Sequence, residues 1–218
     1  MFKTILFTLI LLYTSSAFAA GDGYIYDFKG PVLINGKLAN KNSPVTFGDE
    51  IITGSRGRIA LRLAGNVYRV GNRSHLTLPK TEKNFTLNFF FGSVLAVFRS
   101  DTPKTIRTHT SVLGVRGTGL YLNVDSEQTF LCTCYGDIEF KDKENEDNVR
   151  HIHGEYHNIV ALNHQTRTFS TQAMKGHQTS DLKGHQTSDL FELEALANRT
   201  PPPTFTVEHE KNNQVSGD

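Results

Sequence analysis

The sequence predicts an all-β fold, an antiparallel β-sandwich or β-roll that ends in a short C-terminal helix. Residues 23–140 consist of short strand-like runs, many of them rich in phenylalanine, separated by turn signals. The turns recur at intervals of roughly 8–12 residues, which is typical of a sandwich, barrel or coiled β-roll. Apolar residues at helical spacing follow near the C-terminus, in SDLFELEALANR (188–199).

The first 19 residues have the three-part organisation of a secretory signal peptide. Lys3 supplies the positive charge, residues 4–13 form an apolar run, and Ala17 and Ala19 form an A-x-A cleavage site. The run is shorter than the roughly 20 residues of a membrane-spanning helix. We therefore expect cleavage after Ala19 and no membrane span in the mature chain. The expected location is the periplasm, with secretion as the alternative.

Residues 20–145 are expected to form the β-domain. The Asn35-Gly36 pair is a strong hairpin signal, and RIALRLAG (58–65) alternates with the period of a half-buried strand. FTLNFFFGSVLAVF (85–98) predicts a hairpin through the core. In GVRGTG the three glycines do not match a nucleotide-binding loop, because strand residues and not a helix follow them. They predict instead a bend or bulge where another backbone approaches closely, at Gly114, Gly117 and Gly119.

Residues 146–200 are expected to form a histidine-containing extension. EYHNIVAL (155–162) predicts a strand, and the octapeptide KGHQTSDL follows twice in tandem, at 175–182 and 183–190. Two polar copies are too few for a solenoid, so we expect one functional copy and one spacer. A helix is expected next, on the apolar stripe of Leu190, Leu193, Leu196 and Ala197. It must end before the prolines at 201–203, and residues 201–218 are expected to be a disordered tail.

Charge and motifs narrow the class of function. The chain has 23 lysines and arginines against 22 aspartates and glutamates, so loss of Lys3 with the signal peptide leaves a neutral protein. A nucleic-acid-binding protein would show a basic patch, so no nucleic-acid partner is expected. We find no nucleophile elbow, no H-E-x-x-H motif and no paired carboxylates, and therefore expect a binding module and not an enzyme.

Three segments, GDEIITGSRGRIALRLAGNVYRVGNRSHLTL (48–78), GSVLAVF (92–98) and TIRTHTSVLGVRGTGLYLNV (105–124), together resemble the FecR-type periplasmic domain. The resemblance covers about residues 30–140 and implies an all-β periplasmic domain. Known members pass signals from outer-membrane siderophore receptors to sigma-factor systems. This sequence has no cytoplasmic anti-sigma segment, so direct sigma regulation is not implied. It looks more like a stand-alone exported branch of the family, which has a C-T-C-Y-G strand and no assigned activity. This resemblance implies an envelope protein as its partner.

Both cysteines of the chain, Cys132 and Cys134, lie one residue apart in TFLCTCYGDIEF (129–140). Residues i and i+2 of a strand point to the same face. Their Cα atoms lie about 6.5 Å apart, near the upper limit for a disulfide. Three interpretations remain open: a strained redox disulfide, which is the one enzymatic alternative, a pair of metal ligands, or two thiols buried as small hydrophobic groups.

Two cysteines and two histidines would make a tetrahedral site for zinc, copper or iron. The histidines come from the strand and the helix-entry loop that follow the cysteine strand. The predicted metal ligands are Cys132, Cys134, His157 and His185. The FecR-like branch usually has two adjacent histidines where this chain has Tyr156 and His157, so one of the two positions matches. His151 and His153 are an alternative pair on one face, and His177 duplicates His185.

Overall fold

The computed structural model describes residues 23–100, 102–172 and 184–215, so the signal peptide and the first octapeptide copy lie outside the described residues. Within those ranges the chain forms 14 strands and two helices. The strands are β1 (Tyr24–Lys29), β2 (Val32–Ile34), β3 (Lys37–Leu38), β4 (Glu50–Thr53), β5 (Arg58–Leu63), β6 (Asn66–Val70), β7 (His75–Thr77), β8 (Thr86–Val97), β9 (Lys104–Arg107), β10 (Ser111–Val124), β11 (Gln128–Asp142), β12 (Val149–Gly154), β13 (Asn158–Asn163) and β14 (Phe169–Gln172). The helices are α1 (Thr187–Leu196) and α2 (Pro203–Val215).

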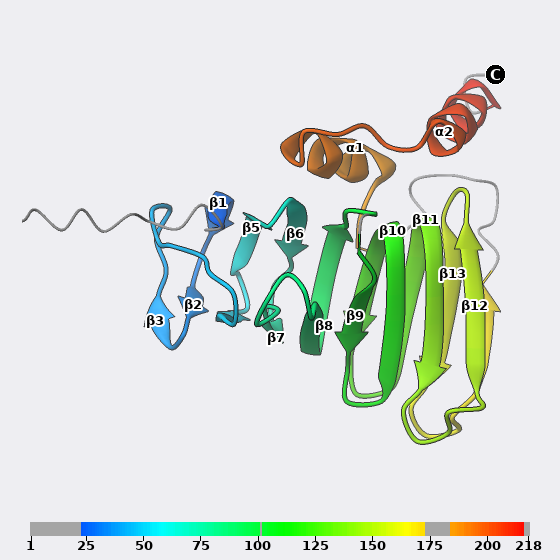
Figure 1. Ribbon diagram of the computed structural model, residues 1–218, viewed down its shortest axis with the longest axis horizontal. Coiled ribbons are helices and arrows are strands. Elements are labelled where there is room, and N and C mark those ends of the chain that lie inside the picture. The colour runs from blue at the N-terminus through cyan, green and yellow to red at the C-terminus, as the bar shows by residue number, and fades with distance from the viewer. Residues whose placement is uncertain (1–22, 101, 173–183, 216–218) are drawn as a thin grey trace, which may run out of the picture.

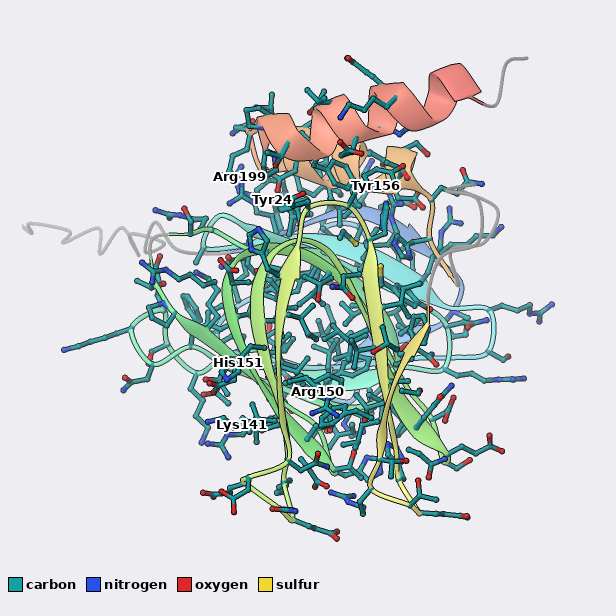
Figure 2. The ribbon with its side chains drawn as sticks, turned by 90° about the vertical axis from the view of Figure 1, so that its right-hand side faces the viewer. Tyr24, Lys141, Arg150, His151, Tyr156 and Arg199 are labelled. Carbon is teal, nitrogen blue, oxygen red and sulfur yellow. The ribbon has the colours of Figure 1, made fainter. Side chains whose placement is uncertain are left out.

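All strands belong to one sheet, whose main path runs β14-β13-β11-β10-β9-β8-β7-β4-β2-β3. Every pairing is antiparallel except the parallel pair β8 and β9. Figure 2 shows the sheet curving around a packed interior, and both figures place α1 and α2 together beyond one end of the strands. The predicted all-β class with a short C-terminal helix is confirmed.

Alternation along the central strands divides the apolar residues between two clusters. In β10, Leu120 and Leu122 belong to the larger cluster inside the curved sheet, whereas Tyr121 between them belongs to a second cluster. In β11, Leu131 likewise joins the first cluster while its neighbours join the second. The second cluster also contains Leu190, Leu193 and Ala197 of the α1 region and Phe205 of α2. At that end of the strands, the helices therefore pack against side chains of the sheet that face away from the main core.

Several local predictions are confirmed. Asn35 and Gly36, both with positive φ, form the two-residue turn of the β2–β3 hairpin. The pairing of β10 with β11 shifts register between Arg116 and Gly119, where the glycines predict a bulge. A Cβ on Gly136 would lie 2.5 Å from the carbonyl oxygen of Gly117, so the two backbones do approach closely there.

Other local predictions are wrong. Residues 85–98 do not form a hairpin, because β8 continues through Gly92, which bends it with a φ of +95°. The first part of β8 pairs with β7 and the second with β6 and β10, so the two halves of this bent strand have different partner strands. The region expected to be a disordered tail contains α2, which is held by the fully buried Phe205.

Candidate metal centre

The cysteines occupy the middle of β11, a strand that has neighbours on both sides. Cys132 is opposite Tyr121 of β10 and Ile159 of β13, so the backbone on either side fixes its position. Cys132 and Cys134 both have an exposed fraction of 0% and belong to the cluster beneath the helices. Their Sγ atoms lie 3.9 Å apart on one face, as the period of a strand requires. Both are free thiols in the structure.

His157 is placed by a turn and not by a strand. It lies between β12 and β13, has a φ of +50°, and donates its backbone N–H to the carbonyl oxygen of Cys134 at 3.1 Å. This contact turns the imidazole inward, and Nδ1 lies 3.5 Å from Sγ of Cys132. On the other side of the ring, Nε2 lies 3.2 Å from the Thr187 hydroxyl. Both ring nitrogens therefore have buried partners.

His185 is brought in by the approach to α1. Its Nε2 lies 3.6 Å from Sγ of Cys134, and its ring stacks on Tyr121 with the centroids 4.8 Å apart. The following residue, Gln186, caps α1 and donates its backbone N–H to the carboxylate of Asp189 at 2.7 Å. Asp189 also accepts from Arg69 of β6 at 2.6 Å. The start of α1 is thus fixed to the sheet beside His185.

Gly184 allows this approach, and its replacement by alanine should displace His185. Its φ is +81°, and a Cβ there would lie 2.0 Å from the Tyr121 hydroxyl oxygen. We expect Gly184→Ala to cost roughly 1–3 kcal/mol of stability and to weaken metal binding. Thermal unfolding and zinc titration would measure both effects. Gly176→Ala, the same change in the first octapeptide, is the matched control, and equal effects of the two changes would contradict this role.

The four predicted ligands converge. One ligand atom from each of Cys132, Cys134, His157 and His185 lies within 4.8 Å of all the others, and all four residues are buried. A tetrahedral ion with Zn–S bonds of about 2.3 Å and Zn–N bonds of about 2.0 Å places two sulfurs about 3.8 Å apart and a sulfur and a nitrogen about 3.5 Å apart. The observed separations are 3.9 Å for the sulfurs and 3.5 and 3.6 Å for the two sulfur–nitrogen pairs. This cluster could hold a metal ion.

The two thiols differ in acidity. Burial raises the pKa of Cys132, but hydrogen bonds with Cys134, His157 and His185 outweigh it and hold this pKa well below the ordinary value. Burial, together with the hydrogen bond to Cys132 and the charge there, raises the pKa of Cys134 well above the ordinary value. The pair thus favours one thiolate and one thiol. A bound cation would favour the second thiolate as well.

The alternative histidines do not join the cluster. His151 and His153 are exposed and contact carboxylates of β11, with His151 3.7 Å from Glu139 and His153 2.7 Å from Asp137. In Figure 2 His151 lies well away from the helices, near which Tyr156 and Arg199 are found. His177 lies outside the described residues.

Sequence reasoning missed a buried ion pair beside the site. The Tyr135 hydroxyl donates to Glu194 of α1, and Arg199 donates to the other carboxylate oxygen at 2.8 Å. Burial and the charge of Glu194 raise the pKa of Tyr135 far above its ordinary value, so it stays a hydrogen-bond donor. Because Tyr135 directly follows Cys134, its hydrogen bond to Glu194 holds α1 next to the cysteines, and Arg199 compensates the charge of the buried carboxylate. An acidic residue on the apolar face of the predicted helix was the available signal.

Comparisons with known proteins add little to this geometry. No family model matches the chain, and no curated protein matches it. Two crystal structures of a candidate anti-sigma factor from Parabacteroides distasonis, at 2.50 and 1.65 Å resolution, are similar to part of it. They are 15% identical, have TM-scores of 0.48 and 0.49, and match over 56% of this chain. The match spans 58% of the length of those chains, and at this similarity it assigns no family.

Proposed function

We propose that this protein is an exported metal-binding module of the bacterial cell envelope. Cys132, Cys134, His157 and His185 hold one transition-metal ion, and zinc is the first choice among zinc, copper and iron. The observation that carries the proposal is the convergence of four buried ligand atoms within 4.8 Å of one another, with one sulfur–sulfur and two sulfur–nitrogen separations close to those around a tetrahedral ion. Four protein ligands fill a tetrahedral ion, so the site has the composition of a structural centre and not of a catalytic one.

The ion has a mechanical role in this proposal. The two cysteines come from β11, His157 from the turn before β13, and His185 from the segment that leads into α1. One ion joined to all four ties the C-terminal helices to the sheet. When bound, it supplies positive charge that keeps both sulfurs as thiolates. The chain itself contributes the dry surroundings and the fixed donor positions.

The envelope part of the proposal is supported by the sequence. The N-terminal segment is typical of export, and residues 30–140 resemble the FecR-type domain, which implies a binding or signalling role and an envelope protein as partner. Among the described residues, neither helix has the length and hydrophobicity needed to cross a membrane. Cell fractionation, with N-terminal sequencing of the mature protein, tests export. A chain that stays in the cytoplasm with its first 19 residues attached would contradict it.

Metal content tests the binding site directly. We expect the mature protein, purified without chelator, to carry about one zinc ion per chain by elemental analysis. We expect His185→Ala, and a variant with both cysteines changed to serine, to lose the ion. His177→Ala changes the same residue of the other octapeptide and should keep it. A folded wild-type protein that binds neither zinc nor cobalt, and whose thiols react freely, would overturn the proposal.

A thiol–disulfide activity is the second candidate, because the lowered pKa of Cys132 favours a nucleophilic thiolate. Burial opposes it, since both cysteines have an exposed fraction of 0% beneath the helices. A bridge would also need the sulfurs to move from 3.9 Å to about 2.05 Å apart. An intramolecular disulfide in the mass spectrum of the native, metal-free protein would favour this candidate over the metal site.

A further inference from the structure

A polar connection leads away from the metal site on the far side of His157. Nε2 of His157 lies 3.2 Å from Oγ1 of Thr187, the first residue of α1. Thr187 has an exposed fraction of 0%. Its Oγ1 lies 3.4 Å from the Tyr156 hydroxyl, which in turn lies 3.4 Å from Nδ1 of His209 in α2. The connection therefore runs from a candidate ligand to both helices.

The protonation state of an imidazole ligand determines which group donates each hydrogen bond in this connection. A neutral imidazole that offers Nδ1 to an ion carries its proton on Nε2, and that N–H needs an acceptor when it is buried. The Thr187 hydroxyl oxygen can accept a hydrogen bond from the Nε2–H of His157, and its own O–H can donate to the Tyr156 hydroxyl. Leaving the N–H without an acceptor would cost roughly 1–3 kcal/mol.

The helix does not use this hydroxyl for its own N-terminus. The N-cap residue of α1 is Gln186, and the exchange of hydrogen bonds there involves Asp189. Thr187 is fully buried, with its hydroxyl beside the His157 ring. Its hydroxyl is thus placed for the ligand and not for the helix.

We propose that Thr187 is a positioning residue of the metal centre, which orients His157 and presents Nδ1 to the ion. This inference rests on the proposed function, since it needs the ion to be bound. Because Thr187 belongs to α1, it also makes metal affinity depend on docking of the helix. By linkage, the ion then favours helix docking by the same factor.

The test compares three variants of the mature protein by competition for zinc and by the spectrum of bound cobalt. Thr187→Val keeps the shape and removes the hydroxyl, and we expect it to weaken zinc binding roughly 10- to 100-fold. Thr187→Ser keeps the hydroxyl and should restore binding to within about threefold of wild type. Thr179→Val, at the same position of the first octapeptide, should bind as wild type does. A perturbed cobalt spectrum is expected in Thr187→Val alone.

The results of this test distinguish a failure of the proposed role of Thr187 from a failure of the proposed metal site. Wild-type affinity in Thr187→Val, or equal losses in the valine and serine variants, overturns the role of Thr187 and leaves the metal site intact. A wild-type protein that binds neither metal overturns both proposals. If Thr187→Val does not fold, Thr187→Ala provides the same comparison with Thr187→Ser.

Discussion

Removal of the metal ion should free the C-terminal helices from the sheet while the sheet itself stays folded. The expected sign is rapid tryptic cleavage after Arg199 once a chelator has been added. In the structure Arg199 donates to the buried carboxylate of Glu194, and its side chain has an exposed fraction of 27%. Release of the helices breaks this ion pair and exposes the Arg199 side chain fully, so the cleavage rate should rise when they leave the sheet.

The two apolar clusters explain why the effect should be confined to the helices. Among the described residues, the cluster inside the curved sheet includes none from α1 or α2, whereas the cluster beneath the helices contains both cysteines. At a free zinc concentration 100 times the dissociation constant, linkage supplies about 2.7 kcal/mol. If the released form binds no metal, the chelator should raise the population of the open form, and the cleavage rate after Arg199, about 100-fold.

The matched control is the variant in which both cysteines are serine. Its cleavage after Arg199 should be fast and should not respond to the chelator, because it has no ion to lose. Cleavage after Arg107, in β9 and far from the helices in sequence, should stay slow in both proteins. The mechanical role would be refuted by wild-type protein that loses its ion to the chelator and is still cut slowly after Arg199.

The sequence was sufficient for features that depend on local periodicity. The same-face placement of Cys132 and Cys134 follows from the strand period, and the Asn35-Gly36 turn follows from the need for positive φ at two successive residues. The presence of a helix at α1 follows from the apolar spacing of its leucines. Because β11 pairs with β10, β12 and β13, which are all close to it in sequence, the strands beside the cysteines could also be predicted from the sequence.

Features that depend on contacts between distant segments of the chain could not be predicted from the sequence. The bend of β8 depends on partners from β6, β7 and β10, so no local pattern distinguishes it from a hairpin. Thr187 and Glu194 gain their roles from the turn before β13 and from Tyr135, which no spacing within α1 reveals. The helix α2 has a weak apolar pattern, and a short helix of this kind is stable mainly through its packing.

Phe205→Ala should have the largest effect of any change in α2, lowering the free energy of docking of that helix by roughly 3–5 kcal/mol. The Phe205 ring is fully buried and lies 5.3 Å from Tyr135, 5.2 Å from Tyr156 and 5.4 Å from His157, measured between ring centroids. Its removal leaves a cavity against a candidate ligand. Hydrogen exchange of the α2 amides would measure the loss.

Val207→Ala is the matched control, because Val207 lies on the same helix with an exposed fraction of 47% and should change exchange little. Since the Phe205 ring packs on His157, Phe205→Ala should also weaken zinc binding, whereas Val207→Ala should not. Equal exchange in the two variants would mean that Phe205 does not hold α2. Faster exchange in Phe205→Ala with unchanged zinc affinity would mean that α2 docks independently of the ion, and that the ion fastens α1 alone.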